Sequence, residues 1–212
     1  MEQKNADELK ARSRAAFDAQ AETYDAGMQG DHARGLYRIV AGEVARACGG
    51  IDSPRVLDLG CGTGALAETV LDEIPGCALV GVDLSANMAE RAAERLGGRA
   101  EVVVGDAERL PFRDNSFDAA YCNDSFHHYP DPALAAFQVW RALRPGGTFV
   151  VGDVWQAAPA RTVMNAGMPH PAEGDVRIYS EGEMREILGT WFGSVSWRRI
   201  GLTSCVAIAR KD

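Results

Sequence analysis

The stretch VLDLGCGTG, from Val56 to Gly64, constrains the fold more than any other part of this chain. A short apolar run typical of a buried strand leads into three glycines within five positions, and helical apolar spacing follows them. Residues without a Cβ permit a tight turn and let a ligand lie against the backbone. The stretch therefore predicts a strand–turn–helix unit. Its turn is either a ligand site or a plain structural connection.

Short strand-like runs alternate with longer helical segments along the rest of the chain. CALVGVDL, AEVVVGD, FDAAYCN and TFVVGDVW read as strands, and SANMAERAAERL and PALAAFQVWRAL read as helices. Ser85 is a predicted N-cap, and Gly97 and Pro145 mark predicted helix ends. We predict an α/β, Rossmann-like fold: a seven-stranded, mostly parallel sheet with helices on both faces, a closing hairpin and an antiparallel last strand.

The first 50 residues do not alternate between strand-like and helical segments. They contain two helical segments, Ala6–Thr23 and His32–Cys48, separated by the region of Gly27 and Gly30. We expect these helices to form an N-terminal cap that packs on the sheet rather than folding alone. The predicted division is a cap at 1–50 and a core at 51–212, together making one structural domain.

Composition excludes several classes of protein. The 212 residues are 46% hydrophobic with a formal net charge of -8, and no Lys/Arg-rich run is present, so no nucleic-acid partner is indicated. No window has about 18 uninterrupted apolar residues, so we expect no membrane segment and a cytoplasmic location. The five cysteines form no CxxC pair, and we expect buried, reduced thiols.

A second acidic residue narrows the choice of ligand. Asp83 ends a predicted strand 25 positions after Asp58 (83 − 58), close to the spacing at which nucleotide-binding folds place a carboxylate on ribose hydroxyls. Dinucleotide folds use G-x-G-x-x-G, whereas here the third glycine comes one position early and Asp58 precedes the turn. A carboxylate beside the turn repels pyrophosphate and attracts a cation. S-adenosylmethionine, which carries a sulfonium and an ammonium, fits this pattern better than a nicotinamide or flavin dinucleotide.

At these residues the chain resembles the class I S-adenosylmethionine-dependent methyltransferases, within the small-molecule group that includes the ubiquinone and menaquinone biosynthesis enzymes. VLDLGCGTG resembles the first motif of that family, GVDLS its ribose-binding strand end, GDAERLPF its adenine-contacting segment and LRPGGTFVVGD its fifth strand. The resemblance runs roughly from Phe17 to Arg210. It implies methyl transfer to a small-molecule acceptor, with S-adenosylhomocysteine as the second product.

The resemblance also implies roles around the methionine and ribose parts of the cofactor. Gly60 and Gly62 would approach the methionine part. Asp58 would lie near its ammonium, directly or through water, and Asn123 would contribute its carbonyl there. Asp83 would hold the ribose hydroxyls.

Five further residues would complete the cofactor site by the same resemblance. Leu84 and Met88 would border the adenine. Asp106 would accept from the adenine amino group, and the backbone N–H of Ala107 would meet a ring nitrogen. Tyr24 would close over the cofactor as a lid, although an aromatic residue at a helix end also packs without a ligand.

His128, and less favourably His127, are the candidate catalytic residues. Both follow the fourth predicted strand, and an imidazole can take a proton from a hydroxyl or amine acceptor. The alternative is a hydrogen-bonded loop anchor, because methyl transfer can proceed by positioning alone. We expect no metal, since His127, His128, Asp124 and Asp131 show no recognisable ligand spacing.

The segment Trp155–Tyr179 follows the fifth strand, where the family usually builds its acceptor pocket. Met164, Met168 and His170 are candidates to line that pocket, with a surface loop as the alternative. Three other functions remain alternatives to methyl transfer: a non-catalytic protein that binds the cofactor or its product, an enzyme that transfers another group from a related sulfonium, and a nicotinamide-dependent oxidoreductase. The sequence does not distinguish O-, N-, C- and S-methylation, or a monomer from a homodimer.

Overall fold

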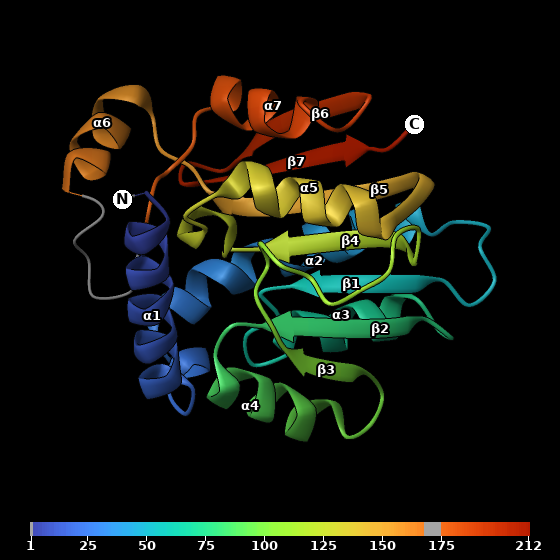
Figure 1. The fold of residues 1–212 in the computed structure, drawn as a ribbon. Helices are drawn as coiled ribbons and strands as arrows, with labels where there is room; N and C mark the ends of the chain where they lie inside the picture. The colour runs from blue at the N-terminus through green and yellow to red at the C-terminus, as the bar shows by residue number, and fades with distance from the viewer. Residues whose placement is uncertain (1, 168–174) are drawn as a thin grey trace.

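The predicted strands assemble into one sheet in the order β3-β2-β1-β4-β5-β7-β6 (Figure 1). In this computed structural model, which describes residues 2–167 and 175–212, β1, β2, β3, β4 and β5 pair in parallel. β7 runs antiparallel to both of its neighbours, β5 and β6, and forms the closing hairpin with β6. The predicted fold class is confirmed. The strands are β1 Arg55–Leu59, β2 Ala78–Asp83, β3 Glu101–Val104, β4 Phe117–Asn123, β5 Leu143–Val154, β6 Ser194–Ile200 and β7 Ser204–Arg210.

Helices cover both faces of the sheet, as the alternating pattern predicts. In Figure 1, α2 and α3 lie behind the sheet and α5 and α7 in front of it. Each face has its own buried apolar cluster, and the two clusters share no residue. The helical elements are α1 Glu2–Gln20, η1 Tyr24–Ala26, α2 Met28–Ala47, α3 Ala65–Glu73, α4 Ala86–Leu96, η2 Phe126–His128, α5 Pro132–Ala142, α6 Ala158–Gly167 and α7 Glu181–Gly189.

Strand β1 shows how the sequence orients the future site. Leu57 and Leu59 belong to the apolar cluster under α5 and α7, whereas Val56 belongs to the cluster under α2 and α3. Because side chains alternate along a strand, Asp58 points to the same face as Val56. Its partner in register on β4 is Tyr121, so these two polar side chains are brought together inside the α2 face.

The start of α2 differs from the prediction. The helix begins at Met28, four residues before the predicted His32, and Gly30 lies inside it rather than in a connection. A Cβ at position 30 would lie 2.6 Å from the carbonyl oxygen of Tyr24. This glycine therefore lets the first turn of α2 pack against η1, a tertiary contact that outweighs its low helix propensity.

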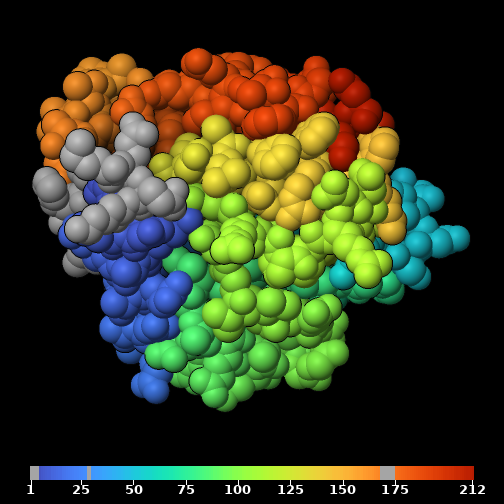
Figure 2. Space-filling view, in the orientation of Figure 1, coloured from blue at the N-terminus to red at the C-terminus, as the bar shows by residue number. Residues whose placement is uncertain are grey.

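The N-terminal helix α1 lies at the edge toward which the arrowheads of β1 to β4 point in Figure 1, and it packs on α4. In Figure 2 its blue atoms lie against green atoms of the central chain. The Asp18 carboxylate accepts a hydrogen bond from Ser85 Oγ at 2.6 Å. The backbone carbonyl of Asp18 accepts one from the Asn87 side-chain amide at 3.0 Å. Asp25 in η1 accepts from Thr63 Oγ1 (2.8 Å), so the N-terminal segment is tied to the glycine turn.

Local signals read from the sequence are confirmed at several points. Ser85 caps α4 by accepting the Met88 N–H at 3.1 Å, and Gly97 ends the helix in the left-handed conformation. All five cysteines are buried and free. Among the described residues, the helices include none long and apolar enough to cross a membrane.

The N-terminal cap of α7 allows a test of how local structure contributes to the stability of the fold. The Ser180 hydroxyl accepts the Glu183 N–H, and the Glu183 carboxylate accepts the Ser180 N–H, which makes a complete capping box. We predict that Ser180→Ala lowers the free energy of unfolding by about 1 kcal/mol. Urea denaturation followed by circular dichroism measures the change, and unaltered stability would show that the cap contributes nothing.

Candidate functional site

The turn after β1 presents backbone rather than side chains at the carboxyl edge of the sheet. Gly60 and Gly62 have φ of 71° and 52°. A Cβ on Gly60 would lie 2.2 Å from Ser125 Oγ, whereas one on Gly62 would meet nothing within 4 Å. Gly60 is therefore needed for the close approach of two loops. Gly62 is needed for its left-handed backbone, and it leaves open space beside it.

Asp58 lies on the strand that leads into this turn. Its side chain is buried, with the residue only 3% exposed, and it accepts a hydrogen bond from the Tyr121 hydroxyl at 2.8 Å. Burial raises the pKa of Asp58 to about 7; the charge of Asp83 adds to the shift, and the Tyr121 hydrogen bond opposes it. Near neutral pH the carboxyl group is therefore divided between its neutral and ionised forms. A cation beside it would favour the ionised form.

Asp83, at the end of β2, connects the glycine turn to the start of α4. One of its oxygens accepts the Gly62 N–H and the other accepts the Ser85 N–H, both at 2.8 Å. Burial raises the pKa of Asp83 to about 6, against the effect of these hydrogen bonds. Because a carboxylate can accept about four hydrogen bonds, these two leave acceptor capacity for a ligand diol.

Asp106 forms an ion pair with a lysine that no sequence pattern connects to it. Lys10 of α1 lies 2.8 Å from Asp106 Oδ2 and 2.5 Å from Glu108 Oε2. The other Asp106 oxygen accepts the Glu108 N–H at 2.9 Å. Burial lowers the pKa of Lys10, but the two carboxylates outweigh it and the net shift is upward. The N-terminal helix thus supplies a partly buried cation at this end of the site.

A first cavity, with about 990 Å³ of empty space including its opening, joins these features at the carboxyl ends of β1, β2 and β4. This is where the strand order reverses, between β1 and β4, and open α/β sheets bind ligands at such a point. The structure brings together all the cofactor residues suggested by the sequence, together with His128: Tyr24, Asp58, Gly60, Gly62, Asp83, Leu84, Met88, Asp106, Ala107, Asn123 and His128.

A second cavity adjoins the first. Phe17, Tyr24, Asp124 and His128 line both, so these four residues mark the junction between the two. The Phe17 ring contacts His128 edge-on, with ring centroids 5.1 Å apart. Met164, one of the residues predicted to line an acceptor pocket, lines the second cavity. Met168 and His170 lie outside the described residues.

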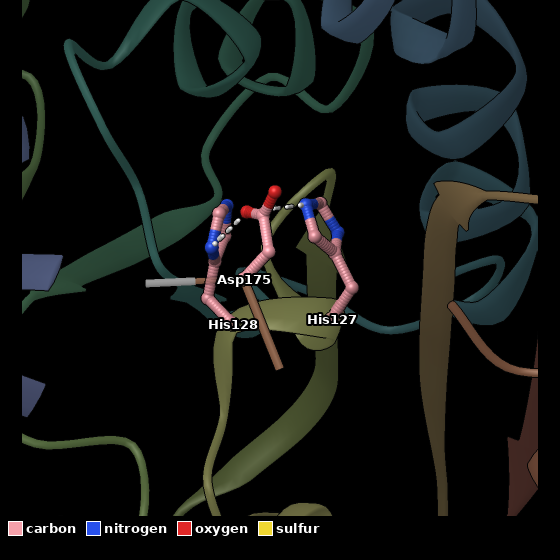
Figure 3. A group of neighbouring side chains, drawn as sticks. All are labelled: His127, His128 and Asp175. Atoms are coloured by element: carbon pink, nitrogen blue, oxygen red, sulfur yellow. Dashed lines mark ion pairs between the residues drawn. The ribbon is translucent and has the colours of Figure 1, made fainter. Parts of the chain in front are cut away.

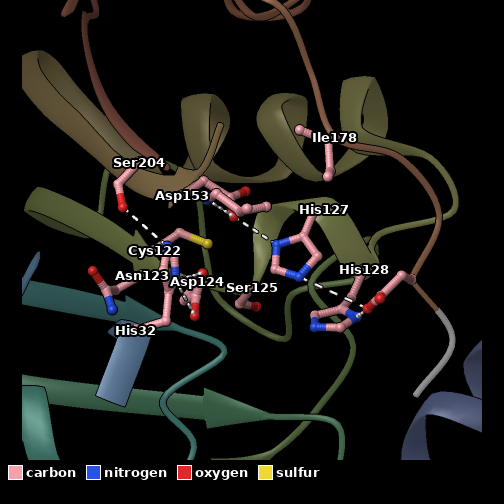
Figure 4. A network of polar contacts seen from close by, with 12 residues as sticks. His32, Cys122, Asn123, Asp124, Ser125, His127, His128, Asp153, Ile178 and Ser204 are labelled. Atoms are coloured by element: carbon pink, nitrogen blue, oxygen red, sulfur yellow. Dashed lines mark hydrogen bonds and ion pairs between the residues drawn. The ribbon is translucent and has the colours of Figure 1, made fainter. Parts of the chain in front are cut away.

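Histidine–aspartate pairs lie at the second cavity (Figure 4). His127 Nδ1 lies 2.6 Å from Asp153 Oδ1. His128 Nδ1 lies 2.9 Å from Asp175 Oδ1. Burial lowers the pKa of His127, but Asp153 outweighs it and raises the pKa to about 9. Burial and the charge on His127 lower the pKa of His128. The two adjacent rings therefore have opposite tendencies to carry a proton.

A third histidine–aspartate pair connects α2 to the junction between the two cavities. His32 Nδ1 lies 2.9 Å from each oxygen of Asp124, and its Nε2 lies 2.9 Å from Ser204 Oγ. Asp124 has a φ of 54°, which is uncommon outside glycine and occurs at functional sites. The neighbouring Asn123 donates its side-chain amide to the Ala33 carbonyl at 3.2 Å. The α2 helix is thus hydrogen-bonded to the end of β4.

Several residues of the site were missed by sequence reasoning. Asp153 ends β5 at the same edge as Asp83 and Asp124, so an acidic residue at a strand end was a usable signal. Lys10 and Asp175 gave no such signal, because each reaches the site from a segment distant in the sequence.

Comparison with known proteins agrees with this geometry. Residues 57–151 match a family described as a methyltransferase domain. Over 145 residues, 68% of this chain, the sequence is 32% identical to the demethylmenaquinone methyltransferase of Renibacterium salmoninarum, and 54% of that protein is covered. Over 102 residues, 47% of the chain, it is 39% identical to the malonyl-acyl-carrier-protein O-methyltransferase of Geobacter sulfurreducens, and 38% of that protein is covered.

A solved structure shares nearly the whole fold. The 1,6-didemethyltoxoflavin-N1-methyltransferase of Burkholderia thailandensis superposes with a TM-score of 0.72 at 24% identity, covering 97% of this chain and 90% of that one. Residues 57–151 therefore match a methyltransferase domain, and the chain resembles the class I S-adenosylmethionine-dependent methyltransferases of ubiquinone and menaquinone biosynthesis. It spans about half or less of the length of the curated relatives named here.

The buried Asp58 carboxyl has a consequence for stability. Its pKa is higher in the folded chain, about 7, than the ordinary value of 3.8, so stability is lost as the pH rises between these values. We predict that Asp58→Asn, which cannot ionise, raises the free energy of unfolding at pH 8 by on the order of a few kcal/mol and has little effect at pH 4. Denaturant titrations at both pH values measure this. An equal effect at both would contradict the shifted pKa.

Proposed function

We propose that this protein transfers the methyl group of S-adenosylmethionine to a small-molecule acceptor. The observation that carries the proposal is the junction of two cavities at Phe17, Tyr24, Asp124 and His128. With the cofactor in the first cavity and the acceptor in the second, the sulfonium methyl would lie at this junction. Holding both reactants in line and excluding water supplies much of the catalysis that such a displacement needs.

The charge of the first cavity supports a cationic cofactor. Asp58, Asp83, Asp106 and Glu108 line it, and Lys10 is the basic side chain among its described lining residues. The proposed ammonium site is beside Asp58, with the methionine part along Gly60 and Gly62 and the ribose on Asp83. A pyrophosphate in the same place would meet these carboxylates, which disfavours a dinucleotide.

The adenine end of the site uses the remaining residues. Leu84 and Met88 would border the ring, the Ala107 N–H would meet a ring nitrogen, and Asp106 would accept from the amino group. Lys10 can remain paired with Glu108 at 2.5 Å when the adenine shares Asp106. Asn123 would offer its carbonyl near the ammonium, and Tyr24 would cover the cofactor from η1.

The second cavity supports a small acceptor. It has about 650 Å³ of empty space, including open solvent, and apolar residues such as Met164 and Ile178 line it beside the histidines. In the Burkholderia structure, 1,6-didemethyltoxoflavin and S-adenosylhomocysteine are bound together. The general-base role of His128 or His127 stays a prediction, and a different role for both rings is argued below.

Activity is tested with labelled S-adenosylmethionine and a panel of phenols, quinols, thiols and amines, followed by mass spectrometry. The proposal predicts acceptor-dependent formation of S-adenosylhomocysteine and of a methylated product. Tight cofactor binding without product from any acceptor would favour the non-catalytic alternative. A nicotinamide dinucleotide retained through purification would contradict the proposal.

The ribose role of Asp83 is tested by binding alone. We predict that Asp83→Asn weakens binding of S-adenosylhomocysteine by about 2 kcal/mol, roughly 30-fold, because charge-assisted hydrogen bonds to the diol are lost. Isothermal titration calorimetry measures the affinity. Asp72→Asn is a matched control, since that carboxylate is exposed and pairs with Arg99 away from the cavity. Unchanged affinity in a folded Asp83 variant would exclude the ribose role.

A further inference from the structure

We propose that His127, His128 and Asp175 form a binding site for a divalent transition-metal ion of the zinc type. The expectation of no metal rested on the spacing of the two histidines with Asp124 and Asp131, and Asp175 was not among the residues considered. One nitrogen from each ring and one carboxylate oxygen lie within 4.8 Å of one another. Figure 3 shows the Asp175 carboxylate between the two imidazole rings. The site opens on the second cavity, whose lining includes all three residues.

The distances and the donor types both suit such an ion. Asp175 Oδ1 is 2.9 Å from His128 Nδ1 and 3.8 Å from His127 Nε2. Ligands bound to zinc at about 2.0–2.2 Å are about 3–3.5 Å apart in a four-coordinate site, so small side-chain adjustments would complete it. Two imidazoles with one carboxylate are ligands of zinc and iron, whereas magnesium and calcium take oxygen ligands.

Two of the proposed ligand atoms are otherwise unsatisfied. His128 Nδ1 and Asp175 Oδ1 are both buried, and among the described residues neither has a hydrogen-bond partner of acceptable geometry, although they are only 2.9 Å apart. Buried polar atoms are nearly always hydrogen-bonded, so an exception requires an explanation. A cation that accepts a lone pair from each atom would satisfy both.

The surrounding residues hold the ligands in place. His127 Nδ1 contacts Asp153 Oδ1 at 2.6 Å, which directs Nε2 toward Asp175, and Asp153 is itself fixed by the Val154 N–H at 2.7 Å. A carboxylate behind a ligating histidine is the usual second partner in metal sites. The His127 carbonyl also accepts the Val176 N–H at 2.9 Å, which fixes the segment carrying Asp175 beside the histidine pair.

A site with three protein ligands leaves a coordination position for water or for an oxygen or nitrogen of a bound molecule. This role excludes the general-base role for His128, because a ring nitrogen bound to a cation cannot take a proton and the other nitrogen carries one. Metal binding needs neither cofactor nor acceptor. Its success or failure is therefore independent of the proposed methyl transfer.

The test uses the full chain, stripped of metal with a chelator and titrated at pH 8 with zinc chloride and, separately, with magnesium chloride. We expect one zinc per chain and no saturable magnesium binding. Asp175→Asn and His128→Gln should each weaken zinc binding at least tenfold, and Asp153→Asn about tenfold through the orientation of His127. Cobalt substitution should give a visible absorption band that the Asp175 variant loses.

His32→Gln is the matched control, because His32 also pairs with a carboxylate in the second cavity but lies outside the three-residue group. It should bind zinc like the unaltered protein. Binding of S-adenosylhomocysteine confirms that the Asp175 variant is folded, since Asp175 does not line the first cavity. Absence of stoichiometric zinc, or equal zinc affinity in the folded Asp175→Asn and His32→Gln variants, would overturn the proposal.

Discussion

The buried hydrogen bond between Asp58 and Tyr121 is the interaction on which the rest of the site depends. Parallel pairing of β1 with β4 places the two residues in register, so the carboxyl group lies where the strand order reverses. Burial makes this carboxyl costly to ionise unless a cation is beside it. The fold thus contains an acidic position whose charge a cationic ligand would stabilise.

The other polar groups extend this arrangement along the same edge of the sheet. Asp83, Asp124 and Asp153 stand at the ends of β2, β4 and β5, because parallel strands present their carboxyl ends together. Each is paired with backbone N–H groups or a histidine, so none is an isolated buried charge. The N-terminal segment completes the enclosure with Lys10, Phe17 and Tyr24.

The sequence predicted the features that depend on local pattern. The alternation of strand-like and helix-like segments predicted the sheet and its closing hairpin, and Ser85 before a helical segment predicted the cap of α4. The glycine-rich turn predicted the position of the first cavity. The start of α2 was predicted too late, because the contact of Gly30 with η1 is tertiary. The cofactor roles of the predicted residues stay predictions, although those residues share one cavity.

The second cavity could not be predicted to the same degree. Asp175 lies 47 positions after His128 (175 − 128), and no periodic pattern joins them. Lys10 reaches Asp106 only because α1 packs across the strand ends. Such contacts between distant segments decide which imidazoles have carboxylate partners, and therefore what chemistry the histidine pair can perform.

Calorimetric titration with S-adenosylmethionine from pH 6 to pH 8 tests most directly whether Asp58 makes this cavity a site for a cation. With the pKa of Asp58 near 7, affinity should rise by up to about tenfold over this range as the carboxylate forms. Ionisation of Asp83, which has a pKa of about 6, adds a smaller increase in affinity near pH 6. Tyr121 and Cys61 stay neutral, because burial raises the pKa of each well above this range. Asp58→Asn should lose the rise around pH 7, whereas the same pH dependence in both proteins would contradict the account.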